Sequence, residues 1–344
     1  MKIDIKSLSL EELKNLILSL NEPKYRAEQI YPFISKGIEN LDQIPNIPKN
    51  LKQKLSEVSY ISKADIYRKL ESKEDETKKY LIELDDGNIV ETVLMKYKHG
   101  LSICISTQVG CRMGCKFCAS TIDGLLRNLT PGEILGQIIT VQKDAGERIS
   151  NVVIMGSGEP FDNMDNLEKF FEIVHEEKGL NIGYRHITVS TCGLVPQIKR
   201  LAELEIPVNL AISLHQTEQS KRQEIMPIAK KYNIKELIST ANWYSKVTKR
   251  RVTFEYALIS GVNDNVETAM ELVKLLRGSL SHVNIIPVNE IVENNFKRPN
   301  MKKVKAFQEI LLKNNIEATV RRELGKDISG ACGQLRRSSI KESP

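Results

Sequence analysis

The sequence has no long apolar run and few of the residues that hold secreted or fibrous proteins together. No stretch approaches the roughly 20 apolar residues that span a bilayer. Asp4 places a carboxylate where a signal peptide needs an uninterrupted apolar stretch. The six cysteines are too clustered for a disulfide framework. We therefore expect a cytoplasmic enzyme or binding protein with no membrane partner.

The composition is that of a globular protein whose charge is unevenly distributed. Of 344 residues, 41% are hydrophobic and 27% are charged, which suffices for two domains or for one large α/β barrel with an appendage. The net charge is only +6. Residues 295–344 contain 12 Lys or Arg and five Asp or Glu, so this segment carries the excess. A basic face suits a polyanion such as RNA, although a solvated surface gives the same pattern.

Residues 1–60 are predicted to form a helical accessory domain. Ser9 and Glu12 form a capping box ahead of apolar residues at helical spacing. Pro23 marks the start of a second helix, and a third helix is expected over residues 51–58. We expect this domain to contact RNA.

Residues 61–98 are predicted to form an antiparallel β linker. Residues 80–84 and 89–95 alternate between apolar and polar side chains, and the sequence Asp-Asp-Gly-Asn lies between them. That sequence is typical of a hairpin turn. Glu91 lies on the second strand of this hairpin.

From residue 99 to residue 338 strands and helices are predicted to alternate. Strands are expected at 101–106, 152–155, 186–191, 208–214, 252–259 and 283–288, and helices at 131–143, 167–176, 234–246, 266–277 and 301–314. This alternation predicts an α/β fold with a parallel sheet, either a partial (βα)₆ barrel or a doubly wound sheet. Residues 339–344 are expected to be a frayed tail.

Distinctive residues follow the predicted strands. These residues lie at or after the carboxyl end of a predicted strand: Cys111, the sequence Gly-Ser-Gly-Glu at 156–159, Ser190-Thr-Cys192, Ser213-Leu-His215 and Asn289. Because the carboxyl ends of barrel strands share one rim, we expect these residues to converge there.

Three cysteines are spaced as ligands of an iron–sulfur cluster. Cys111, Cys115 and Cys118 form a C-x₃-C-x₂-C motif, which can bind three irons of a [4Fe–4S] cluster and leave the fourth iron open. A zinc site is the alternative, but zinc usually takes a second C-x₂-C pair or histidines, which this motif lacks.

This motif, with Phe117 before its last cysteine, resembles that of the radical S-adenosylmethionine superfamily. The resemblance narrows to the RlmN family of RNA adenine methyltransferases and extends to Leu335. It is carried by Thr107-Gln-Val-Gly-Cys111, Gly156-Ser-Gly-Glu-Pro160, Ser190-Thr-Cys-Gly193, Ile212-Ser-Leu-His215, Met226-Pro-Ile228, Gly261-Val-Asn-Asp264 and Ala331-Cys-Gly-Gln-Leu335. Ser157 departs from the family pattern, which usually has Met there, and we expect binding to survive the change.

The resemblance implies a reaction and its partners. The product would be 2-methyladenosine in 23S rRNA and, 3′ of the anticodon, in tRNA. The fold would be a partial (βα)₆ barrel containing a [4Fe–4S] cluster. Two S-adenosylmethionine molecules would be used per turnover, with flavodoxin or ferredoxin as electron donor, and the chain would act as a monomer.

The resemblance also implies which residues bind S-adenosylmethionine. Gly158 and Glu159 would hold its methionine amino group, although such a loop alone is more often a tight turn. The remaining contacts would come from Ser190, Ser213, Leu214, His215 and Asn289. Without the family pattern, His215 would be a hydrogen-bonded histidine at a strand end.

Three residues would then carry the chemistry. Cys332 would receive a methyl group and donate its carbon to the adenine, Glu91 would take the ring proton, and Cys104 would form a transient disulfide with Cys332 to free the product. The structural alternatives are a small buried cysteine, a surface carboxylate and a strand cysteine that faces opposite to Ile103 and Ile105. Cys192 has no assigned role.

Two alternatives stay open. A Cfr-like enzyme would methylate carbon 8 of adenosine, and only Pro160 after Glu159 favours RlmN over it. An iron–sulfur electron carrier or RNA-binding scaffold without turnover would have no use for Glu91 and Cys332.

Overall fold

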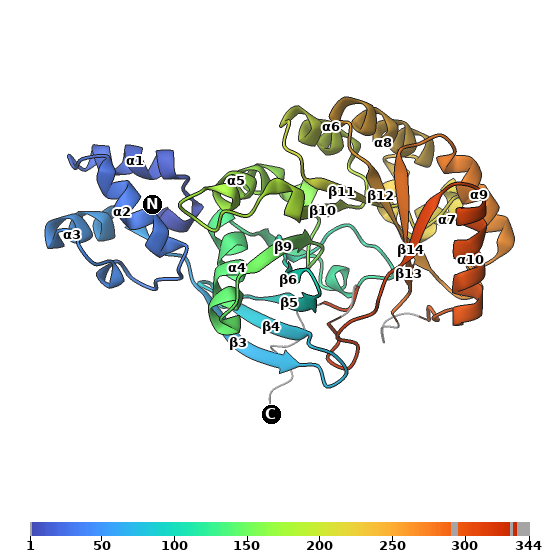
Figure 1. The fold of residues 1–344 in the computed structure, drawn as a ribbon, viewed down its shortest axis with the longest axis horizontal. Helices are drawn as coiled ribbons and strands as arrows, with labels where there is room; N and C mark the ends of the chain where they lie inside the picture. Colours follow the sequence, from blue (N-terminus) through green and yellow to red (C-terminus); the bar gives the residue numbers. More distant parts are fainter. Residues whose placement is uncertain (1, 290–294, 331–332, 336–344) are drawn as a thin grey trace.

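The computed structural model describes residues 2–289, 295–330 and 333–335. Its centre is an open ten-stranded sheet, and a group of small helices lies at one end (Figure 1). Cys332 and the predicted frayed tail lie outside the described residues.

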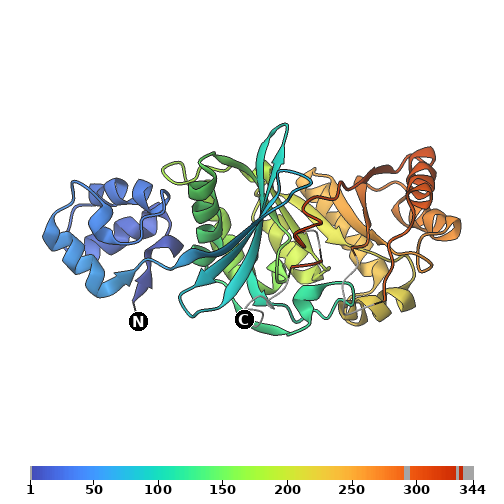
Figure 2. The same ribbon diagram turned by 90° about the horizontal axis from the view of Figure 1, so that it is seen from below.

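The small helices belong to the start of the chain. Strand β1 (Ile3–Asp4) pairs in parallel with β2 (Ser59–Tyr60), and α1 (Leu10–Ser19), α2 (Tyr25–Ile34) and α3 (Lys49–Val58) lie between them in sequence. The capping box predicted for Ser9 and Glu12 is present. The helices share a hydrophobic cluster of their own and lie beside the sheet in Figure 2. The Ser7 hydroxyl, just after β1, accepts a 2.8 Å hydrogen bond from the Gly132 N–H and so contacts the main body.

Three antiparallel strands connect these helices to the barrel. They are β3 (Ala64–Glu71), β4 (Lys78–Leu84) and β5 (Ile89–Tyr97). The predicted hairpin is confirmed, because β4 and β5 pair through Lys78–Leu94 to Glu83–Ile89. Strand β5 then pairs with the first parallel strand, so one sheet includes all three.

Seven parallel strands form the rest of the sheet. They are β6 (Gly100–Cys104), β9 (Ile149–Ile154), β10 (Ile187–Thr191), β11 (Asn209–Ser213), β12 (Val252–Leu258), β13 (Ser281–Pro287) and β14 (Glu317–Val320). They lie side by side in chain order. A doubly wound sheet reverses its strand order at a switch point, so that alternative is wrong and the partial (βα)₆ barrel is confirmed. The six predicted strands are present, whereas β14 was not predicted.

Helices cover the outer face of the sheet (Figure 1). They are α4 (Pro131–Ala145), α5 (Met164–His175), α6 (Val195–Glu203), α7 (Gln219–Ile225), α8 (Ile234–Thr248), α9 (Val266–Leu276) and α10 (Met301–Lys313). Local sequence sets several boundaries: Asn233, Asn265 and Asn300 each cap a helix by accepting a backbone N–H. None of the described helices is both long enough and apolar enough to cross a bilayer.

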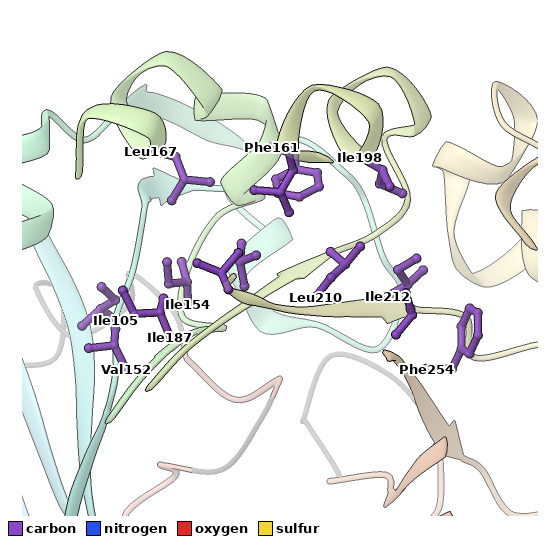
Figure 3. Packing of buried hydrophobic residues seen from close by; sticks show 14 of the residues in the cluster. Ile105, Val152, Ile154, Phe161, Leu167, Ile187, Ile198, Leu210, Ile212 and Phe254 are labelled. Atoms are coloured by element: carbon purple, nitrogen blue, oxygen red, sulfur yellow. The ribbon is translucent and has the colours of Figure 1, made fainter. Parts of the chain in front are cut away.

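The main core fills the space between this helical layer and the sheet. In Figure 3, Leu167 on α5 and Ile198 on α6 face Ile154, Leu210 and other strand residues. The opposite face of the sheet is more polar, because Ser190, Ser213 and similar side chains alternate with those of the core. Burial of one face therefore leaves the other to line a pocket.

Leu167→Ala should destabilise the protein by about 2–5 kcal/mol, because Leu167 is completely buried and its loss leaves a cavity. Leu312→Ala is the matched control, since Leu312 lies on α10 with its side chain exposed. Chemical denaturation followed by circular dichroism measures both. Equal midpoints for the two variants would contradict this account of the core.

Candidate active site

A pocket lies at the carboxyl ends of the parallel strands, as the sequence predicts. Its lining includes the predicted ligand residues Cys111, Cys115, Cys118, Gly158, Glu159, Ser190, Ser213, His215 and Asn289. These residues are spread over almost 180 positions of the sequence. The parallel sheet brings them together because its strands all end at one rim.

The three motif cysteines lie on a loop next to a small β ribbon. Strands β7 (Gln108–Gly110) and β8 (Leu125–Asn128) pair, and the Cys111 N–H donates to the Gly124 carbonyl at 2.9 Å. Gly110 has a φ of +76°, and a Cβ there would collide with that same carbonyl. The ribbon thus needs glycine at the position before the first cysteine.

Burial makes two of these cysteines poor thiolates on their own. It raises the pKa of Cys111 to about 12 and that of Cys115 well above its usual range. A metal ligand must be deprotonated, so binding to iron would have to overcome this cost. Among the described residues no three His, Cys, Asp or Glu side chains converge as ligands of one metal ion do. The thiolates that bind a cubane cluster can lie farther apart than the ligands of a single ion, because each thiolate binds a different iron.

Arg222 lies against this cysteine loop and is completely buried. Its Nη2 donates to the carbonyls of Cys192 at 2.9 Å and Ser213 at 3.1 Å, and its Nε donates to Leu214 at 3.1 Å. Burial lowers the pKa of Arg222, while Cys192 and Cys115 act in the opposite direction. Its Nη1 has no hydrogen-bond partner within the described part of the chain. A negatively charged group bound by the cysteines would offset this buried positive charge.

The Glu159 carboxylate fastens two loops of the rim together. One oxygen accepts from the Phe161 N–H at 3.1 Å and the other from the Cys192 N–H at 2.8 Å. Burial raises the pKa of Glu159, whereas these backbone donors favour its ionised form. Each carboxylate oxygen has a second lone pair, so the group can still accept from an ammonium ligand.

Gly158 allows the rim loop to approach β7 closely. It has a φ of +106°, and a Cβ there would lie 2.6 Å from that of Gln108. Ser157 lies outside the pocket lining, and its carbonyl accepts the backbone N–H groups of Thr107 and Gln108. The departure from the family pattern at Ser157 therefore falls beside the pocket.

His215 is buried at the pocket wall in a fixed orientation. Its Nδ1 accepts a 2.8 Å hydrogen bond from the Ala257 N–H, which leaves Nε2 as the donor of the neutral ring. Burial, followed by the charge of Arg222, lowers the pKa of His215 to about 3. The ring of Phe117 packs edge-on against the His215 ring, with 4.6 Å between the two ring centroids. His215 is thus a neutral hydrogen-bond donor across the physiological pH range.

Leu214 differs from the other predicted ligand residues. Its side chain lies in the main core, and it is absent from the pocket lining. Its neighbour Ser213 lines the pocket, since alternate residues of a strand face opposite sides of the sheet.

Glu91 on β5 and Cys104 on β6 lie on neighbouring strands, and neither is among the residues that line the pocket. Glu91 is 4% exposed, so the surface-carboxylate alternative is wrong. Cys104 packs with Val93 and Leu335, whereas Ile103 and Ile105 belong to the core under the helices. The predicted direction of Cys104 is therefore confirmed.

Cys332 lies outside the described residues, but both sides of its loop are held. Lys79 Nζ donates to the Ser329 carbonyl at 3.3 Å. On the other side, the Ala119 N–H donates to the Gly333 carbonyl at 2.8 Å and the Ser120 hydroxyl to that of Leu335 at 2.7 Å. Gly333 also lines the pocket, so the chain returns to the cysteine loop there.

Several residues at or beside the site were not predicted from the sequence. Arg222 lies in the polar sequence of α7, which is typical of an exposed helix. Glu255, on β12, lines the pocket and accepts from the Asn284 side chain at 2.9 Å. Gln108, whose Nε2 donates to Asp162 Oδ2 at 3.0 Å, was named only as a member of a family motif and was given no role of its own. Position in the fold, rather than local sequence, makes these residues part of the site.

Two family profiles match the chain. The Radical SAM superfamily matches residues 105–273, and the ribosomal RNA large subunit methyltransferase N-terminal domain matches residues 3–61. The first match includes the cysteine loop and much of the parallel sheet, and the second includes the small helices.

Relatives align over nearly the whole chain. A probable dual-specificity RNA methyltransferase RlmN of Clostridioides difficile is 54% identical, and the alignment covers 98% of each chain. The protein of the same name from Clostridium perfringens is 56% identical, again over 98% of each. A crystal structure of a radical SAM methyltransferase from Sphaerobacter thermophilus superposes with a TM-score of 0.93 at 42% identity, covering 97% of this chain and 99% of that one. The chain therefore belongs to the RlmN family of radical SAM RNA methyltransferases.

Proposed function

We propose that this chain methylates carbon 2 of adenosine in 23S rRNA and in tRNA, 3′ of the anticodon, through a methyl group carried on Cys332. Its relatives have the name of dual-specificity RNA methyltransferases. The observation that carries the proposal is the convergence of three motif thiols, Glu91, Cys104 and both flanks of the Cys332 loop around the rim of the sheet.

The family uses a [4Fe–4S] cluster and S-adenosylmethionine, and the pocket fits both groups. Cys111, Cys115 and Cys118 would hold the cluster, next to the buried positive charge of Arg222. Glu159 would accept from the methionine amino group through its remaining lone pairs. Ser190, Ser213, His215 and Asn289 would complete the pocket around the rest of the molecule. Bound there, the pair would supply one-electron chemistry that removes a hydrogen atom from a methyl group.

The chain's own residues account for the remaining steps. As a thiolate, Cys332 would take a methyl group from one S-adenosylmethionine, and a second molecule would be used for hydrogen removal. The methylene carbon left on Cys332 would bond to adenine carbon 2, Glu91 would accept the proton that carbon 2 then loses, and the one surplus electron would pass to the cluster. The Cys104 thiolate would then attack the Cys332 sulfur, so that the carbon–sulfur bond breaks, the released carbon takes a proton and a disulfide forms. An external thiol would reduce that disulfide before the next turnover.

RNA must present an unstacked adenine at this rim, as for other enzymes that act on a base. We assign backbone contacts to the helical residues 1–60 and to the basic segment after residue 294, because lysine and arginine neutralise phosphates. A flavodoxin or ferredoxin would supply the electron.

The chain prepared without oxygen should contain about four irons. Replacement of Cys111, Cys115 or Cys118 by alanine should remove most of this iron, because each thiolate is expected to bind one iron of the cluster. Cys192→Ser is the control: Cys192 lines the same pocket but lies outside the motif, so iron should stay. Elemental analysis and electron paramagnetic resonance measure the result. Stoichiometric zinc without iron would contradict this assignment.

The position of methylation tests the proposal most directly. Transcribed 23S rRNA fragments and tRNA with adenosine deuterated at carbon 2 should lose that label on methylation, whereas a label at carbon 8 should remain. Mass spectrometry of the nucleosides measures both. Loss of the carbon 8 label would instead make the enzyme Cfr-like. Formation of 5′-deoxyadenosine without any methylated nucleoside would reject the transferase function altogether.

A further inference from the structure

Lys79 is a buried lysine within the antiparallel part of the sheet. Only 6% of the residue is exposed, and its Nζ lies 3.1 Å from Glu91 Oε1. The carboxylate is equally buried, so both charges have lost most of their water. A buried pair of this kind contributes little net stability, because desolvation offsets the attraction. Net stability therefore does not explain why this pair lies beside the proposed base, whereas a role in the reaction would explain it.

Strand register places Lys79 on the pocket side of the sheet. Lys79 is the partner of Val93, which in turn is the partner of Cys104. Glu91, two residues before Val93, lies on the same face because side chains alternate along a strand. The lysine, the proposed base and the proposed resolving cysteine thus share one face of three neighbouring strands.

The same lysine also reaches the loop that leads to Cys332. Its Nζ donates to the Ser329 carbonyl at 3.3 Å, across 250 positions of sequence. One ammonium group therefore joins the proposed base to the backbone three residues before the proposed methyl carrier.

Further contacts hold this loop against the turn between β3 and β4. The Asp327 carboxylate accepts from the Ser72 hydroxyl at 2.7 Å and the Lys73 N–H at 2.8 Å. Asp75 accepts from the Gly325 N–H at 3.0 Å. Because these contacts are independent of Lys79, they would still hold the loop if the lysine were replaced. The lysine therefore adds a link to Glu91 that the fold of the loop does not need.

We propose that Lys79 is a positioning residue for the transferase: through its ion pair it holds the Glu91 carboxylate at a fixed position relative to residues 325–330, which precede Cys332. This inference rests on the proposed function. In the step concerned, carbon 2 has already bonded to the methylene carbon on Cys332. The carbon 2–hydrogen bond then breaks, its electron pair returns to the ring, the proton passes to a Glu91 oxygen and the one surplus electron passes to the cluster. Lys79 is assigned no direct contact with the adenine or the cofactors.

Lys79→Met removes the charge and retains the length of the side chain. With reconstituted full-length enzyme, S-adenosylmethionine and dithionite, the variant should still methylate Cys332, as detected by peptide mass spectrometry. Turnover of tRNA should fall at least about tenfold, but by less than the roughly 10²–10⁴-fold that complete loss of a general base costs. Deuterium at carbon 2 should slow the variant more than it slows the wild type, because proton removal limits its rate. Lys79→Arg, which retains the charge, should recover part of the activity.

Lys78→Met is the matched control. Lys78 is the neighbouring residue, more exposed and paired with Glu71, so its loss should leave turnover and the isotope effect unchanged. A double-mutant cycle separates a positioning role from a purely structural one. In a Glu91→Gln background Lys79→Met should cost little more, since the lysine acts through that carboxylate.

Equal turnover and isotope effects in wild type and Lys79→Met would overturn the inference, as would a full additional loss in the Glu91→Gln background. If Lys79→Met does not fold, Lys79→Arg decides: an activity as low as that of Glu91→Gln would show that charge at this position does not help the base. Retention of the carbon 2 label by the wild type is a different result, which rejects the proposed function itself.

Discussion

Two buried charged side chains fasten the rim on which the rest of the site depends. Glu159 accepts a backbone N–H from Phe161 and another from Cys192, which joins the loops after β9 and β10. Arg222 donates to the carbonyls of Cys192, Ser213 and Leu214, which joins the ends of β10 and β11. Separation of these loops would leave the two buried charges without partners, and this would strongly destabilise the folded chain. These hydrogen bonds therefore fix the relative positions of the loops that line the pocket.

The Cys332 loop depends on two elements that lie outside the main helical layer. Before Cys332, the turn between β3 and β4 and Lys79 hold residues 325–329. After it, Ala119 and Ser120 of the cysteine loop hold Gly333 and Leu335. In the proposed reaction, Cys332 would first accept a methyl group and then meet an RNA base. The described residues on either side of Cys332 are therefore attached to two separate parts of the site.

Sequence patterns predicted the fold well where they were periodic. The six longer parallel strands and the capped helices have clear apolar spacing, whereas β14 is only four residues long and α7 has a polar sequence. Most of the rim was predictable because it follows strand ends. Lys79, Arg222 and Glu255 were not, since their burial comes from contacts with segments distant in sequence. Glu91 shows the same limit: its alternating strand suggested exposure, but Lys79 pairs with it and Leu335 packs on the same face of the sheet.

In the proposed reaction, Cys332 carries the transferred carbon to the adenine, and Cys104 then releases the methylated adenine. Cys104→Ala tests it directly, because adduct formation precedes the step assigned to Cys104. Incubated with tRNA, S-adenosylmethionine and dithionite, this variant should accumulate a covalent protein–RNA adduct. Nuclease and protease digestion followed by mass spectrometry should find a methylene bridge between the Cys332 sulfur and carbon 2 of an adenosine. Normal turnover by Cys104→Ala with no adduct would contradict the account.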